Sequence, residues 1–232
     1  MYAKYFKRII DFLLSLIAIC VLLPVFLILI IVTAIAMKGN PFFAQLRPGR
    51  IDKKTGKEKI FRMIKFRTMT NEKDENGDFL PDEVRLNRFG RILRSTSLDE
   101  LPELLNILKG DMAIVGPRPQ LVRDMVFMTP EQRVRHSVRP GLTGLAQVSG
   151  RNNITWEEKF TFDLQYINSG ITLWSDLKIV FMTVGKVFCR EDTVREGTVS
   201  DLDFGDYLLQ KGEVTEETYA VLQKEAKQLV GV

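Results

Sequence analysis

A long apolar run near the N-terminus constrains this chain more than any other feature. Residues 12–37 form a stretch of 26 residues without a charged side chain. A helix of about 20 apolar residues is enough to cross the hydrocarbon core of a bilayer. The run is too long for the apolar core of a secretory signal peptide, and no small-residue cleavage site precedes Lys38. We therefore expect a membrane segment.

Flanking charge and a central proline indicate how this segment meets the membrane. Three basic residues precede the run and five follow it within residues 38–54, so the positive-inside rule draws both ends to the cytoplasm. Pro24 is expected to kink the helix, because it removes a backbone hydrogen bond. Each arm of about 13 residues would extend about 20 Å, enough to reach about mid-bilayer and return. We expect a re-entrant helix in residues 1–40, and a single-pass anchor with a proline kink is the alternative.

Composition narrows the function classes for the rest of the chain. A length of 232 residues allows one ordinary core, or one domain with an appendage. The net charge of +4 and the pI of about 9.0 are modest for a nucleic-acid binder, so we expect anionic lipid or a diphosphate substrate instead. Two cysteines and one histidine exclude a disulfide framework, a Cys/His metal cluster and a multi-histidine metal site.

The stretch at residues 94–119 combines a predicted helix with a carboxylate pair. Leucines at spacings of three and four over residues 98–108 predict an apolar helix face, which turns Asp99, Glu100 and Glu103 outward. On spacing alone, Ser97 and Glu100 form a capping box with no further role. The arginines around the pair and the positive end of the helix dipole support the alternative, an ionised Asp99 that is available as a nucleophile or metal ligand.

Four ordered motifs resemble one known family. They are the apolar N-terminal segment, K-F-R-T-M at 65–69, S-L-D-E-L-P-E-L-L-N-I-L-K-G-D-M-A-I-V-G-P-R-P at 97–119 and R-P-G-L-T-G-L-A-Q-V-S-G-R-N at 139–152. The chain resembles the bacterial sugar transferases, the monotopic phosphoglycosyl transferases that begin glycan assembly on a polyprenyl phosphate. The resemblance covers residues 1–200, and it is strongest to the small members, such as those that begin bacterial N-glycosylation.

The resemblance implies a fold and a cellular place. The expected class is α+β and mainly helical, with the re-entrant membrane helix at residues 1–40. A small mixed catalytic domain at residues 41–200 carries interfacial amphipathic helices, and a tail with a short helix occupies residues 201–232. The domain is expected on the cytoplasmic face of the bacterial inner membrane. The apolar spacing in the tail is sufficient to dock on a neighbour, which leaves a homodimer open.

The resemblance also implies a reaction. A phosphosugar passes from a UDP-sugar, expected to be N-acetylated, to undecaprenyl phosphate, and UMP is released. Asp99 matches the nucleophile, which forms an aspartyl-phosphosugar intermediate and binds Mg²⁺, and Glu100 matches its partner carboxylate. Three further positions match residues that bind phosphate or the nucleotide sugar: Arg94, Arg118 and Arg151.

Residues 60–69 alternate in the manner of a strand, which places Lys65 and Arg67 on one face. The family match favours contact with phosphate or lipid headgroups, and a solvated edge strand is the alternative. Residues 42–46 are expected to lead into a basic loop with proline and glycine that extends to Lys59, and residues 139–152 show no helical period. Helices are expected over 83–94 and 156–168. Residues 172–189 predict either an interfacial amphipathic helix or an ordinary core helix, and His136 is expected at a surface or interface.

Two other functions compete with phosphosugar transfer. One is a metal-dependent glycosyltransferase, in which the acidic pair only binds the metal and UDP is released. The other is a non-catalytic membrane-anchored scaffold, whose basic face binds anionic lipid. The identity of the nucleotide product separates the first alternative from the favoured reaction, and the absence of nucleotide-sugar binding would identify the second.

Overall fold

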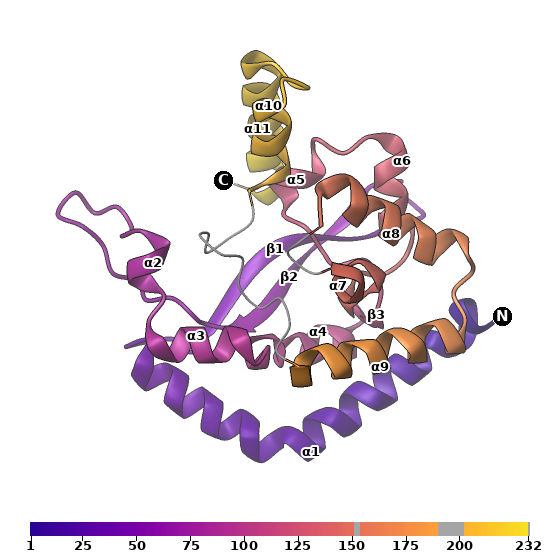
Figure 1. Ribbon diagram of the computed structural model, residues 1–232, viewed down its shortest axis with the longest axis horizontal. Helices are drawn as coiled ribbons and strands as arrows, with labels where there is room; N and C mark the ends of the chain where they lie inside the picture. The colour runs from indigo at the N-terminus through magenta and orange to yellow at the C-terminus, as the bar shows by residue number, and fades with distance from the viewer. Residues whose placement is uncertain (151–153, 190–201, 232) are drawn as a thin grey trace.

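The computed structural model describes residues 1–150, 154–189 and 202–231 as a mixed α+β, mainly helical arrangement. This confirms the expected α+β, mainly helical class, while the re-entrant course of the first helix stays a prediction. The long helix α1 lies along one side of the molecule, and the remaining elements lie in its concave side (Figure 1). The helices are η1 (Tyr2–Phe6), α1 (Lys7–Ala36), α2 (Asp82–Arg85), α3 (Arg88–Ser95), η2 (Leu98–Glu100), α4 (Glu103–Lys109), α5 (Val122–Met125), α6 (Pro130–Arg133), η3 (Val134–Ser137), α7 (Leu145–Gly150), α8 (Trp156–Asn168), α9 (Leu173–Cys189), α10 (Phe204–Gln210) and α11 (Glu216–Val230). The strands are β1 (Phe42–Ile51), β2 (Glu58–Phe66), β3 (Ala113–Val115) and β4 (Gly141–Thr143).

Helix α1 contains the apolar run, and by length and composition it is sufficient to cross a membrane. It is bent rather than straight (Figure 1), and Pro24 lies in its interior, as the expected kink requires. Most of its apolar side chains are exposed. The few buried side chains lie on one face, and they are Lys7, Asp11, Ser15, Phe26, Leu29 and Thr33.

Both ends of α1 are bonded to the same globular unit. Near the N-terminus, Arg8 donates to the carbonyl oxygens of Ile107 (2.5 Å) and Leu108 (2.7 Å), which lie at the C-terminal end of α4. At the other end, Asn87 Nδ2 donates to the carbonyl oxygen of Ala36 at 3.2 Å. Carbonyls in the last turn of a helix lack intrahelical partners, so these contacts satisfy groups at the ends of both α4 and α1.

Strands β1 and β2 form an antiparallel pair in which Phe42 is opposite Phe66 and Arg47 is opposite Phe61. The prediction that a loop begins directly after residue 46 was wrong, because β1 continues through Pro48 and Gly49 to Ile51. Proline is tolerated because both strands of a two-stranded sheet are edges. A side chain at Gly49 would meet the Lys59 carbonyl oxygen at 2.8 Å, so glycine permits this close pairing.

The glycine-rich segment is also more regular than expected over residues 139–150, the part of it that the structure describes. It forms β4, which pairs in parallel with β3, and then the helix α7. A Cβ added to Gly141 would lie 2.2 Å from the backbone nitrogen of Gly116. This glycine therefore allows two backbone segments of the protein to approach each other, rather than allowing the close approach of a ligand.

Three sequence predictions for the helices and His136 had different outcomes. The expected helix at 156–168 is confirmed as α8. The expected helix at 83–94 is broken into α2 and α3, because Asn87 caps α3 by accepting a hydrogen bond from Gly90 N at 2.8 Å. His136 is buried, with Nδ1 3.1 Å from Glu58 Oε1, so its expected surface position was wrong.

The tail forms a helical hairpin, α10 and α11, that packs on α5 and α8 through its own apolar cluster. The buried members of this cluster are Phe127, Met128, Trp156, Phe160, Phe204 and Leu208. Tyr219 and Leu222 of α11 pack against it, and Ala226 is buried, whereas Leu229 is exposed. The apolar face expected in the tail therefore docks mainly on the rest of its own chain.

Two helical glycines give a test of this packing. A Cβ at Gly90 in α3 would lie 1.9 Å from the Thr68 carbonyl oxygen, whereas a Cβ at Gly185 in α9 meets nothing within 4 Å. We expect Gly90→Ala to destabilise the fold by about 1–3 kcal/mol through overpacking. The control, Gly185→Ala, should stabilise it by about 0.5–1 kcal/mol, because alanine restricts the unfolded chain. Thermal unfolding in lipid nanodiscs measures the stability change of both variants. A Gly90→Ala variant as stable as the wild type would contradict the close packing of α3 against Thr68.

Candidate active site

The acidic pair lies in a tight turn rather than in the expected continuous helix. Ser97 has a left-handed backbone (φ 55°), and its side chain makes no capping hydrogen bond, so the capping-box interpretation was wrong. Asp99 and Glu100 lie in the short 3-10 helix η2, and α4 begins only at Glu103 after Pro102. This break changes which side chains of α4 face inward, and the carboxylates do not point outward as the leucine spacing predicted.

Glu100 is held by two cations. Lys65 Nζ lies 2.9 Å from Glu100 Oε1, and Arg118 meets both carboxylate oxygens, with Nη1 at 3.4 Å from Oε2 and Nη2 in a shorter contact with Oε1. Burial alone would raise the pKa of Glu100, but Arg118 and Lys65 outweigh that effect and lower its pKa to about 2. Glu100 is therefore ionised and already paired.

Glu103 is a third carboxylate of the site, and the sequence interpretation placed it wrongly at the surface. It is fully buried, and its Oε1 lies 3.2 Å from Lys65 Nζ. Burial and the neighbouring Glu100 raise its pKa to about 7. Asn106 shows why it faces inward: Asn106 accepts from Ile64 N and donates to the Arg62 carbonyl oxygen, which fixes this face of α4 against β2.

Asp99 differs from Glu100 and Glu103, which both pair with Lys65, because its own carboxylate forms no ion pair with any described residue. It is 9% exposed, and burial together with Glu100 raises its pKa to about 6, which Lys65 and Arg118 only partly oppose. The expectation that its surroundings simply favour the ionised form was therefore wrong. Within the part of the chain that the structure describes, its carboxylate has no ion-pair or hydrogen-bond partner, and it lies at the edge of a cationic cluster.

The structure brings three of the five predicted cationic residues to this pair. Lys65 and Arg118 contact Glu100, and Arg94, which donates to Thr68 Oγ1 at 3.0 Å, interacts electrostatically with Asp99. Arg67 instead donates to the Phe42 carbonyl oxygen at 3.5 Å and contacts neither carboxylate. Arg151 lies outside the described residues.

Two arginines that the sequence did not indicate, the buried Arg135 and the partly exposed Arg47, bond to the backbone of the loop that carries Arg118. Arg135 Nη2 donates to the Arg118 carbonyl oxygen at 2.7 Å and is itself paired with Asp163, with both side chains almost completely buried. Arg47 Nη1 donates to the carbonyl oxygen of Pro119 at 3.2 Å. Nothing in the local sequence distinguishes these arginines from solvated ones, since their partners are distant in the chain.

The site can accommodate Mg²⁺ only with help from oxygen atoms of a substrate. Among the described residues there is no group of three His, Cys, Asp or Glu side chains that could hold a metal ion. Mg²⁺ commonly uses one or two carboxylates and completes its six oxygen ligands with water and substrate phosphates. The unpaired carboxylate of Asp99 fits this pattern.

Comparison with known proteins gives consistent matches. Residues 2–190 match the family model of the bacterial sugar transferases. The chain is 45% identical over 188 residues to an uncharacterized sugar transferase, EpsL, of Bacillus subtilis, covering 80% of this chain and 88% of that protein. It is 36% identical over 196 residues to the UDP-glucose:undecaprenyl-phosphate glucose-1-phosphate transferase of Klebsiella pneumoniae, covering 80% of this chain and 41% of the relative.

A third relative, like the Klebsiella pneumoniae transferase, is much longer than the matched region. Galactosyl transferase CpsE of Streptococcus agalactiae is 39% identical over 181 residues, which is 72% of this chain and 38% of that protein. The chain thus spans most of EpsL, but less than half of these two longer relatives.

Two lysines of β2 test the charge cluster. Lys65→Met leaves Glu103 with its remaining cation, Arg118, at 4.0 Å, so we expect a loss of about 3–5 kcal/mol, as when one partner of a buried pair is removed. The matched control is Lys59→Met, since Lys59 pairs with Asp111 but is 68% exposed, and it should cost less than about 1 kcal/mol. The measurement is the thermal unfolding midpoint. If Lys65→Met and Lys59→Met lower it equally, the charge cluster does not stabilise the fold.

Proposed function

The chain belongs to the bacterial sugar transferase family of phosphoglycosyl transferases, and we propose that it transfers a phosphosugar from a UDP-sugar to undecaprenyl phosphate, releasing UMP. The observation that carries this proposal is the division of roles in the acidic pair. Glu100 is neutralised by Lys65 and Arg118, whereas Asp99 has no such partner in residues 1–150, 154–189 and 202–231. A site that must attack an anionic phosphate needs both features, an available carboxylate and fixed positive charge beside it.

In the first proposed step, an Asp99 carboxylate oxygen attacks the phosphorus that carries the sugar. The bond from that phosphorus to the bridging oxygen breaks, and UMP leaves with the electron pair. Arg94 and Arg118 compensate the negative charge that develops on the phosphoryl oxygens. Bound at Asp99, Mg²⁺ would supply further charge compensation for the diphosphate oxygens.

In the second proposed step, a phosphate oxygen of undecaprenyl phosphate attacks the aspartyl-phosphosugar. The acyl phosphate bond breaks, Asp99 is regenerated as a carboxylate, and the polyprenyl diphosphosugar is released. Glu100 stays ionised throughout, since Lys65 and Arg118 hold it, and it keeps these two cations in place. Lys65 thereby contributes positive charge to the site, whereas Arg67 contacts neither carboxylate and is proposed to contact lipid headgroups.

The membrane arrangement supports the same proposal. The chain associates with membrane through one long apolar helix, and we propose that α1 is re-entrant in the cytoplasmic leaflet of the bacterial inner membrane. Both of its ends are bonded to one globular unit, which favours a helix that returns to the side it entered from. In α9, Trp174 and Phe181 are 81% and 71% exposed, as an interfacial helix requires. The site would then lie near the lipid phosphate.

The sugar is a separate question from the reaction. One relative is named as a UDP-glucose transferase and another as a galactosyl transferase. The resemblance to small family members instead predicted an N-acetylated sugar. We retain the N-acetylated UDP-sugar as the proposed donor. A panel of UDP-sugars, including UDP-glucose, UDP-galactose and their N-acetylated forms, assayed for UMP release with undecaprenyl phosphate, decides between them.

Substitution of the acidic pair tests the nucleophile. We expect Asp99→Asn to abolish both UMP release and the covalent phosphosugar adduct, which intact-protein mass spectrometry detects without acceptor present. Glu100→Gln should lower turnover while permitting some adduct, because it weakens the hold on Lys65 and Arg118 without removing the attacking group. Retained turnover by Asp99→Asn would reject the nucleophile assignment, and release of UDP instead of UMP would favour the glycosyltransferase alternative.

Cysteine accessibility tests the topology. In a background without the native cysteines, Ala3→Cys places one thiol before the N-terminal end of α1, and Lys53→Cys places one beyond its C-terminal end. We expect an impermeant maleimide to label both from the cytoplasmic side of sealed, oriented vesicles and neither from the other side, because both ends of α1 contact one domain. Labelling of the two positions from opposite sides would establish a single-pass anchor.

A further inference from the structure

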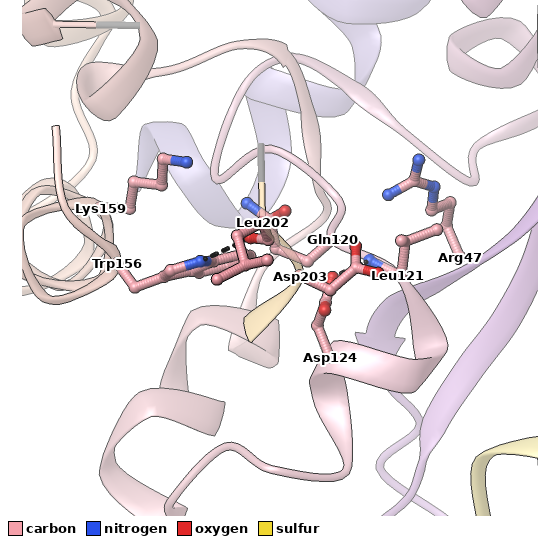
Figure 2. A pocket seen from close by; sticks show the side chains of 8 residues that line it. All are labelled: Arg47, Gln120, Leu121, Asp124, Trp156, Lys159, Leu202 and Asp203. Atoms are coloured by element: carbon pink, nitrogen blue, oxygen red, sulfur yellow. Dashed lines mark hydrogen bonds between the residues drawn. The ribbon is translucent and has the colours of Figure 1, made fainter. Parts of the chain in front are cut away.

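A cavity lies beside the loop that carries Arg118, since Gln120 and Leu121 line it. It has a volume of about 200 Å³ and is lined by residues of four segments that are distant in sequence. Figure 2 shows Gln120 and Asp203 in the middle of this lining, with Trp156 on one side and Arg47 on the other. Gln120 is two residues from Arg118, so their Cα atoms are separated by at most about 7 Å. The cavity therefore adjoins the backbone that carries Arg118, and Arg47 of its lining interacts electrostatically with Arg118.

The side chains in this cavity divide into satisfied and available groups. Asp124 accepts hydrogen bonds from Leu121 N (3.1 Å) and Phe204 N (2.9 Å), so both of its oxygens are used within the protein. Trp156 Nε1 donates to the carbonyl oxygen of Leu202 at 3.1 Å. In contrast, the amide of Gln120 makes no hydrogen bond to any described residue, although it lines the cavity.

The chemistry of the available groups points to one class of ligand. A glutamine amide offers a donor and an acceptor side by side, which matches the edge of a pyrimidine base. Asp203 is partly exposed and pairs with Arg123, and a carboxylate is the group that commonly accepts hydrogen bonds from ribose hydroxyls. Leu121 and Leu202 supply apolar contact for a ring. Arg47 adds positive charge next to Pro119.

We propose that this cavity binds the nucleoside of the donor nucleotide, with Gln120 contacting the pyrimidine edge and Asp203 the ribose hydroxyls. The proposal rests on the proposed function and extends it to donor recognition. Pockets for complete small ligands usually have volumes of about 300–1,000 Å³, so a smaller cavity suits one part of a UDP-sugar rather than the whole molecule. The diphosphate would leave the cavity past Arg47 and Pro119 towards Arg118.

This assignment gives the C-terminal hairpin a part in the site. Leu202 and Asp203 precede α10 and lie beyond residues 2–190, which match the family model. Two contacts fix the hairpin to the wall of the cavity. Phe204 N donates a hydrogen bond to Asp124, and Asp203 forms an ion pair with Arg123. Recognition of the nucleoside would thus depend on a segment outside the part of the chain that carries the acidic pair.

Nucleotide binding by the full-length protein in nanodiscs tests the proposal. The probes are UMP and UDP without acceptor, titrated by calorimetry. We expect Gln120→Ala and Asp203→Asn each to weaken UMP binding about five- to tenfold, as loss of one hydrogen bond implies. The matched control, Gln228→Ala on the exposed side of α11, should bind UMP unchanged. With the preferred UDP-sugar, the two cavity variants should raise KM by a similar factor with little change in kcat.

A photolabel keeps the test independent of folding defects. Irradiation of the wild-type protein with 5-azido-UDP should label peptides that contain residues 119–124 or 202–208, and excess UMP should prevent the labelling. Unchanged UMP affinity in Gln120→Ala, or specific labelling confined to other peptides, overturns the nucleoside assignment even when UMP release proceeds normally. Release of UDP as the product would reject the proposed function instead, and the binding results would still decide what the cavity holds.

Discussion

The site depends on how two cations are shared among three carboxylates. Glu100 and Glu103 both contact Lys65, and Arg118 lies against the same pair, so these four side chains hold β2, η2, α4 and the loop at residues 117–119 together. Carboxylates placed so close together cannot all ionise without such cations. Because buried ion pairs add little net stability after desolvation, the cluster is better explained by the chemistry it prepares than by the fold it stabilises. That chemistry requires an Asp99 carboxylate that no described residue pairs with and that lies beside fixed positive charge.

Helix α1 is part of the same structure rather than an attached anchor. Its N-terminal turns meet α9 through Asp176, which accepts from Lys7 at 2.5 Å, from Tyr2 at 2.8 Å and from Tyr166 at 2.7 Å. Phe26 packs in the cluster that also contains Phe66 and Leu104. The inner face of α1 therefore makes hydrogen bonds and ion pairs in its N-terminal half and apolar contacts in its C-terminal half. Its outer face is apolar. A displacement of α1 in the membrane would move α4 and the acidic pair with it.

The sequence predicted the elements that depend on local signals. Helix α8 has the predicted bounds, with Thr155 as its cap, and Gly110 ends α4 in a left-handed conformation. The acidic pair and Arg118 were identified by resemblance, and the structure brings them together. Predictions failed where a distant contact decides the outcome. Asn106 bonds to β2 and so holds the face of α4 that carries Glu103 inward, and the strand at residues 141–143 forms by pairing with β3. No local pattern encodes either contact.

The loop after Arg118 shows how parts of the chain outside the motifs contribute to the site. Arg135 bonds to the carbonyl oxygen of Arg118, and Arg47 bonds to that of Pro119, so the backbone is held on both sides of the guanidinium that meets Glu100. Asp124 then joins the same loop to the C-terminal hairpin through Leu121 N and Phe204 N. A guanidinium held this firmly loses little freedom when it binds phosphate, which reduces the entropic cost of binding. The hairpin thus belongs to the framework that positions Arg118, although it shares no sequence motif with it.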